Sequence, residues 1–100
     1  MSDESSFADL MRRVRAGDEP AAAELVRRYE SAVRRSVRLR LNQRLRRAVD
    51  SLDVGQAVLG SFFVRVAAGQ YEVETPEQLL KLLSTMVRHK ISKLARHEQA

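Results

Sequence analysis

Apolar residues recur every three or four positions along most of the chain, the spacing that places them on one face of an α-helix. Glycine and proline, which interrupt helices, number only four and two in 100 residues. No stretch of useful length shows the alternation that is typical of β-strands. We therefore predict an all-α fold, a compact bundle of three to four main helices plus a short connecting helical segment. The predicted helices span residues 6–16, 19–41, 51–68 and 76–97, and the short segment lies between the second and third of them.

Residues that favour helix starts stand at these predicted boundaries. Asp18 is the predicted N-cap of the second helix, and either Asp50 or Ser51 caps the third. Thr75 is the predicted N-cap of the last helix, and Gln78 stands three residues later, as a capping box requires. The capping signals and the apolar spacing therefore predict the same boundaries.

Composition limits the classes of protein that the chain can belong to. We predict a single domain over residues 1–100, with residues 1–5 and 98–100 frayed, because this length suits one small domain. Eighteen basic residues, fifteen of them arginine, outnumber thirteen acidic residues and give a net charge of +5. This balance favours a nucleic acid or an acidic protein surface as partner. The chain shows no secretory signal and no membrane span, so we predict a cytoplasmic protein.

Residues that could support enzyme chemistry are missing from the sequence. The chain has no cysteine and only two separated histidines, which argues against a disulfide framework or a zinc site. It also has no glycine-rich phosphate loop and no plausible pair of nucleophile and base. We predict no enzymatic activity, no cofactor and no metal site.

The third predicted helix is apolar on two sides. One side carries valines and a phenylalanine, and the second side mixes a carboxylate, an amide and an aromatic ring. Such a helix is either central in its bundle or covered by a partner, and the spacing alone leaves both interpretations open. The two sides consist of Val54, Val58, Phe62 and Val66, and of Asp53, Gln56, Gly60, Phe63 and Ala67.

The last predicted helix has a polar side on which basic and hydroxyl residues occur without a carboxylate. This pattern suits a phosphate backbone, although a solvated helix face is the simpler alternative. Lys90 is an exception, because on a helical wheel it falls within the apolar arc. The polar side consists of Lys81, Thr85, Arg88, His89, Ser92 and Arg96, with Lys93 at its margin.

Taken in order, these motifs resemble region 2 of the extracytoplasmic-function (ECF) sigma factors of bacterial RNA polymerase. The matching residues are Asp53-Val54-Gly55-Gln56 with Leu59, Phe62 and Phe63, and then the run from Leu82 to Lys90. The early segment from Ala16 to Ala22 also fits the entry to the family's first conserved helix. The resemblance covers about residues 7 to 97 and implies a role in transcription initiation.

The resemblance implies a docking site for core RNA polymerase on the third helix. In the family this helix binds the clamp helices of the β′ subunit, a role that falls here on Asp53 and Gln56. Phe63 or Leu59 would add apolar contact. An anti-sigma factor is a further candidate partner.

The resemblance also implies binding to the minus-ten promoter element and its melting. In the family the loop after this helix captures a flipped base, and here that loop spans Gly69 to Glu77 and contains Gln70 and Tyr71. Capture requires polar groups that read a base edge and often a ring for stacking. The last helix would then follow the DNA, with contacts expected from Lys81, Thr85, Arg88, His89, Lys93 and Arg96.

Three departures from the family pattern stand out. His89 occupies a position where the family often has asparagine, and Leu82 one where an aromatic residue is common. A complete sigma factor also carries region 4, a helix-turn-helix domain that reads the minus-thirty-five element. No residues after 97 could form that domain, so we expect a fragment or a single domain, with a shortened relative of the family as the alternative.

Two other classes of protein remain open from the sequence. The arginine-rich stretch from Arg27 to Arg47 would also suit a general helical nucleic-acid-binding domain without a link to polymerase. A helical protein-interaction module would instead form stable complexes without nucleic acid.

Overall fold

Five helices follow one another in the computed structural model, which describes residues 3–99, with side chains from 6 to 97. No strand occurs within residues 3–99, which confirms the all-α prediction, and both terminal helices extend further than predicted. Residues 1–2 and 100, where fraying was also predicted, lie outside the described residues. The helices are α1 (Asp3–Arg15), α2 (Glu19–Arg40), α3 (Gln43–Ala48), α4 (Ser51–Ala67) and α5 (Pro76–Gln99).

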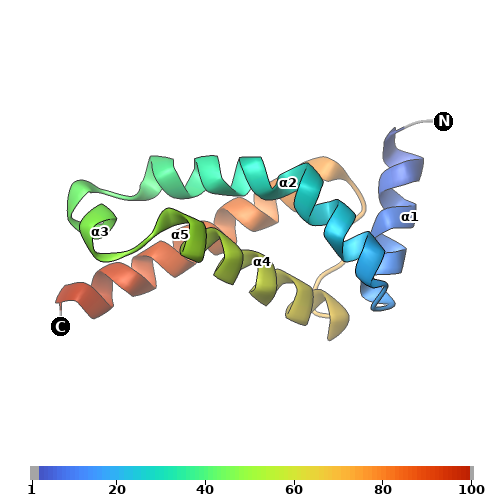
Figure 1. Cartoon of the computed structure of the whole chain (residues 1–100). Helices are drawn as coiled ribbons and strands as arrows, with labels where there is room; N and C mark the ends of the chain where they lie inside the picture. Colours follow the sequence, from blue (N-terminus) through green and yellow to red (C-terminus); the bar gives the residue numbers. More distant parts are fainter. Residues whose placement is uncertain (1–2, 100) are drawn as a thin grey trace.

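Three of these helices, α2, α4 and α5, pack against one another and form the body of the bundle. Helix α1 lies across one end of the molecule, where it contacts α2 and α4 (Figure 1). The short α3 lies at the opposite end, beside the C-terminal part of α5 (Figure 1). The result is an elongated domain of 46 × 25 × 20 Å, as predicted a bundle of four main helices with one short connecting helix.

Apolar side chains from every helix meet in one core. No polar or charged side chain is buried among those described. At the α1 end, the rings of Phe7 and Tyr29 meet edge to face with centroids 6.3 Å apart, a favourable geometry for aromatic pairs. Burial raises the pKa of the Tyr29 hydroxyl above its ordinary value. The largest fully buried side chains are Phe7, Met11, Leu25, Val37, Phe62, Val66, Leu79 and Val87.

The helix starts largely match the capping predictions. Asp50 caps α4, since its carboxylate accepts a hydrogen bond from the Leu52 amide at 2.9 Å. The Thr75 hydroxyl accepts a hydrogen bond from the backbone N–H of Gln78 at 3.1 Å. The side-chain oxygen of Gln78 accepts from the backbone N–H of Glu74, whereas a capping box would have it accept from that of Thr75. These contacts fix where α4 and α5 begin and therefore where the loop between them lies.

The prediction that Asp18 is the N-cap of α2 is confirmed. Its side chain, however, makes no capping hydrogen bond. Its carboxylate instead accepts from Arg13 Nε at 2.8 Å, which raises the pKa of the Arg13 guanidinium. Gly17, with φ of +85°, reverses the chain between them and brings the two side chains together.

Candidate nucleic-acid interface

Helix α4 is central in the bundle and also keeps one side uncovered. It packs against α1, α2 and α5, while Asp53 and Gln56 remain exposed. Two apolar residues share this exposure, Leu52 with 39% and Val64 with 70% of the side chain accessible. The structure confirms the first interpretation, that the doubly apolar helix is central in its bundle. Burial on three neighbours also leaves a mixed surface that a partner could cover.

The sequence-based assignment of Leu59 to this uncovered side was wrong. Leu59 is only 6% exposed and belongs to the core. The reason is helical spacing: Gly55, Leu59, Phe62 and Val66 follow at steps of three and four and face inward together. Phe63 is half-buried, with its ring edge-to-face against Phe62 at 5.6 Å, so only part of it is available for contact.

A groove of about 370 Å³ runs between α4 and α5. Its apolar wall comes from Ala57, Val58, Leu82 and Met86. Ser61, Arg65 and Tyr71 form one polar edge, and Thr85, His89, Lys90 and Lys93 form the other. This volume lies in the range of about 300–1,000 Å³ that small-molecule sites occupy.

Tyr71 is held in this groove from two directions. Its hydroxyl accepts a hydrogen bond from Arg65 Nη1 at 3.1 Å, and its half-buried ring packs against the core. The preceding Gly69 turns the chain with φ of +77°, and Val73, 3% exposed, anchors the loop from below. The ring and the guanidinium together offer a flat apolar surface beside a row of N–H donors.

Four residues that the sequence singled out for DNA binding meet in this groove, namely Tyr71, Thr85, His89 and Lys93. The Thr85 hydroxyl donates to the Lys81 carbonyl at 3.0 Å, which leaves its oxygen free to accept. The other four are exposed but lie outside the groove lining: Gln70, Lys81, Arg88 and Arg96.

Two further residues complete the groove, and only one had drawn attention in the sequence. Arg65 was missed, although the one basic residue of this helix, in its last turn, was a visible signal. Lys90, placed by the helical wheel in the apolar arc, is half-buried at the rim of the core and lines the same groove. No carboxylate among the described side chains pairs with either residue.

Ion pairs are concentrated in the first two helices and do not neutralise α5. Carboxylates of α1, α2 and their connection pair with arginines of the same segment. Within side chains 6–97, the basic residues of α5 have no such partner. A helix that presents uncompensated positive charge beside a groove is suited to a phosphate-bearing ligand.

Within residues 3–99, no group of three or more of the described histidine and acidic side chains could hold a metal ion. None of the helices in that range is both long and apolar enough to cross a bilayer.

A basic groove on an all-helical domain is the electrostatic pattern that nucleic-acid-binding domains use. A family model described as ECF sigma factor matches residues 4–100. The chain therefore belongs to the ECF sigma factor family, a family of transcription regulators that work with core RNA polymerase and promoter DNA. No curated protein and no solved structure matches the chain significantly.

Proposed function

We propose that this chain is a region 2 domain that acts in the cytoplasm, docks on core RNA polymerase and recognises and melts the minus-ten promoter element. The observation that carries the proposal is the groove between α4 and α5, where Tyr71, Arg65, His89 and Lys93 come together. Family membership supports the general role, and the arrangement of side chains supports the assignment of the two surfaces.

The uncovered side of α4 is the proposed docking surface for the β′ clamp helices. Asp53 and Gln56 supply exposed polar groups, and Leu52, Val64 and the accessible part of Phe63 supply apolar area around them. A polar pair set among apolar residues is typical of a protein interface, since the apolar area drives association and the polar pair fixes the orientation. An anti-sigma factor that covered this side would block docking.

Retention of core polymerase on the immobilised domain tests the docking surface. We expect Asp53→Ala/Gln56→Ala to lose most of the retention that the wild-type chain shows. A matched control, Glu19→Ala/Gln43→Ala, removes one carboxylate and one amide from exposed positions elsewhere and should retain polymerase normally. Equal retention by the two double variants would remove the assignment.

The groove is the proposed site for one base extruded from the minus-ten element. Extruding a base from the duplex costs a few kcal/mol, because stacking and pairing are lost. Contacts in the groove must offset this cost. The Tyr71 ring offers stacking, Arg65 and Lys93 offer donors, and Thr85 and His89 can exchange hydrogen bonds with a base edge. The neighbouring phosphates would follow the exposed side of α5 toward Arg88 and Arg96.

Binding of a single-stranded minus-ten oligonucleotide to the polymerase holoenzyme tests the groove. We expect Tyr71→Ala to weaken binding by about 1–3 kcal/mol, the usual contribution of stacking on one aromatic side chain. Tyr71→Phe keeps the ring and removes only the hydroxyl that accepts from Arg65, so it should retain most of the affinity. If the two substitutions behave alike, stacking on Tyr71 is not the source of the affinity.

A further inference from the structure

The arginines of α2 and α3 fall into two groups that differ in their partners. Toward the start of α2, Arg27 and Arg28 pair with Glu24, and six residues further along Arg34 pairs with Glu30 at 3.5 Å. The later arginines are exposed and form no ion pair with any described carboxylate: Arg35, Arg38, Arg40, Arg44, Arg46 and Arg47.

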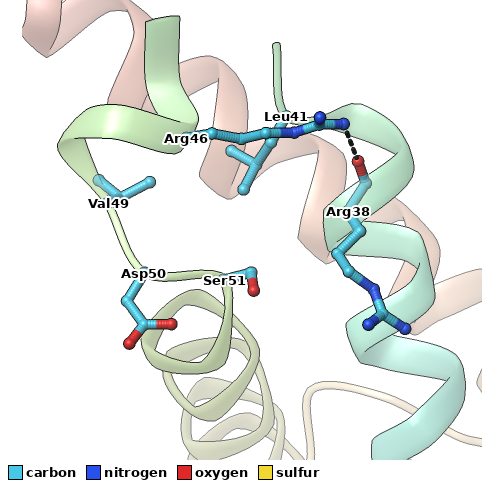
Figure 2. A pocket seen from close by; sticks show the side chains of 6 residues that line it. All are labelled: Arg38, Leu41, Arg46, Val49, Asp50 and Ser51. Atoms are coloured by element: carbon cyan, nitrogen blue, oxygen red, sulfur yellow. Dashed lines mark hydrogen bonds between the residues drawn. The ribbon is translucent and has the colours of Figure 1, made fainter. Parts of the chain in front are cut away.

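Two of the later arginines face one pocket at the corner where α2 ends, α3 turns and α4 begins (Figure 2). The pocket has a volume of about 550 Å³. Arg38 approaches from α2 and Arg46 from α3 (Figure 2). The apolar lining comes from Leu41, beside Arg46, and from Val49, on the side away from Arg38 (Figure 2). Positive groups thus reach the pocket from two separate elements.

Arg46 is held in place by the backbone of α2. Its Nη2 donates to the Arg38 carbonyl at 3.1 Å, as the dashed line in Figure 2 shows. A guanidinium carries five N–H donors in a rigid fork, so this hydrogen bond leaves most of them available. Because the Arg46 side chain is already ordered, ligand binding costs less conformational entropy.

The remaining lining residues are Asp50 and Ser51. One Asp50 carboxylate oxygen is engaged as the cap of α4, accepting from the Leu52 amide at 2.9 Å. Asp50 also lines the pocket, but it forms no ion pair with Arg38 or Arg46, so neither guanidinium has a carboxylate as a direct partner. Ser51 adds a hydroxyl at the floor of the pocket.

We propose that this pocket binds a phosphate group, supplied by the backbone of double-stranded DNA. Two guanidinium forks from different helices, beside a hydroxyl, are complementary to a tetrahedral anion. Helix α3 also contacts α5, whose end carries Lys93 and Arg96 in a second shallow hollow. A duplex that meets the end of α5 therefore lies close to this corner. The inference goes beyond the proposed function, because the pocket shares no lining residue with the docking side of α4 or with the α4–α5 groove.

The salt dependence of duplex binding tests the pocket on the full chain. Fluorescence anisotropy with a labelled duplex of mixed sequence would be followed between about 50 and 200 mM salt. We expect Arg38→Gln/Arg46→Gln to weaken binding and to lower the slope of log K against log salt by about 0.9 for each phosphate that the protein no longer neutralises. Arg27→Gln/Arg28→Gln removes the same charge from the ion-paired part of α2 and should leave the slope near that of the wild type. An equal weakening in both variants would overturn the site, because net charge alone would then explain it.

Amide chemical shifts locate the phosphate and identify its source. Addition of duplex should shift the amides of Val49, Asp50 and Ser51 in the wild-type chain and not in the double variant. If inorganic phosphate alone, at low concentration, shifts the same amides, the pocket is a phosphate site. Its ligand is then a free phosphorylated molecule, and duplex DNA as the source is overturned. Shifts confined to α5 would overturn the pocket and leave the proposed minus-ten role intact.

Discussion

The two sides of α4 differ in their surroundings, since one side builds the core and the other stays uncovered and is the proposed docking surface. Leu59 and Phe62 are buried among α1, α2 and α5, whereas Asp53, Gln56 and Val64 remain exposed on the same 17-residue helix. The apolar content of both sides is high, so hydrophobicity alone does not separate them. What separates them is the presence of neighbouring helices, which the linear sequence does not display.

The largest effect that would test this distinction is expected at Phe62. Phe62 is fully buried, and Phe62→Ala should lower the free energy of unfolding by about 3–5 kcal/mol, because apolar burial is removed and a cavity is left behind. Phe63→Ala, at the half-buried neighbour, should lower it clearly less. Urea denaturation of both variants measures the difference. Equal destabilisation would show that the two sides of α4 are not distinct.

Leu59→Ala addresses the residue whose assignment the structure changed. Leu59 lies in the core, so its truncation should lower the free energy of unfolding by about 2–5 kcal/mol. Polymerase retention by the folded protein, measured well below the denaturation temperature, should stay near the wild-type value. If Leu59→Ala had near-normal stability but no longer retained polymerase, Leu59 would belong to the docking surface after all.

A smaller effect, of opposite sign, is expected at Gly60 on the uncovered side. A Cβ atom built at Gly60 would meet no heavy atom within 4 Å. Gly60→Ala should therefore raise the free energy of unfolding by about 0.5–1 kcal/mol, because alanine loses less backbone freedom in a helix. Thermal or urea unfolding measures the gain. Gly69→Ala is the control, because the φ of +77° there would strain an alanine and lower the free energy of unfolding. A decrease in the free energy of unfolding for Gly60→Ala would show that the side of α4 at Gly60 is not uncovered.

Most of the fold was predictable because it depends on local signals. The three- and four-residue spacing and the caps at Asp50 and Thr75 lie within single segments, and they predicted the helices to within a few residues. Asp18 shows the limit of local rules. Its carboxylate accepts a hydrogen bond from the Arg13 guanidinium instead of from a backbone N–H of α2, because the turn at Gly17 brings the two side chains together.

The candidate site was predictable only in part, because it joins residues from separate elements. Tyr71 and His89 were found through the family resemblance, and the structure places both in one groove. Arg65 was missed because its relevance depends on the loop folding back so that the Tyr71 hydroxyl accepts its hydrogen bond. The pocket between Arg38 and Arg46 depends in the same way on the turn that α3 makes between α2 and α4.

The conformation of the loop that carries Tyr71 has a consequence for the timing of the proposed base capture. It is fixed by Gly69 at its start, by Val73 in the core and by the Thr75 cap at its end. Its conformational entropy is therefore lost when the protein folds, before any DNA arrives, and binding need not order it again. A strand that reaches the groove meets a receptor already in shape, so the opening of the duplex, rather than movement of the protein, should set the rate of capture.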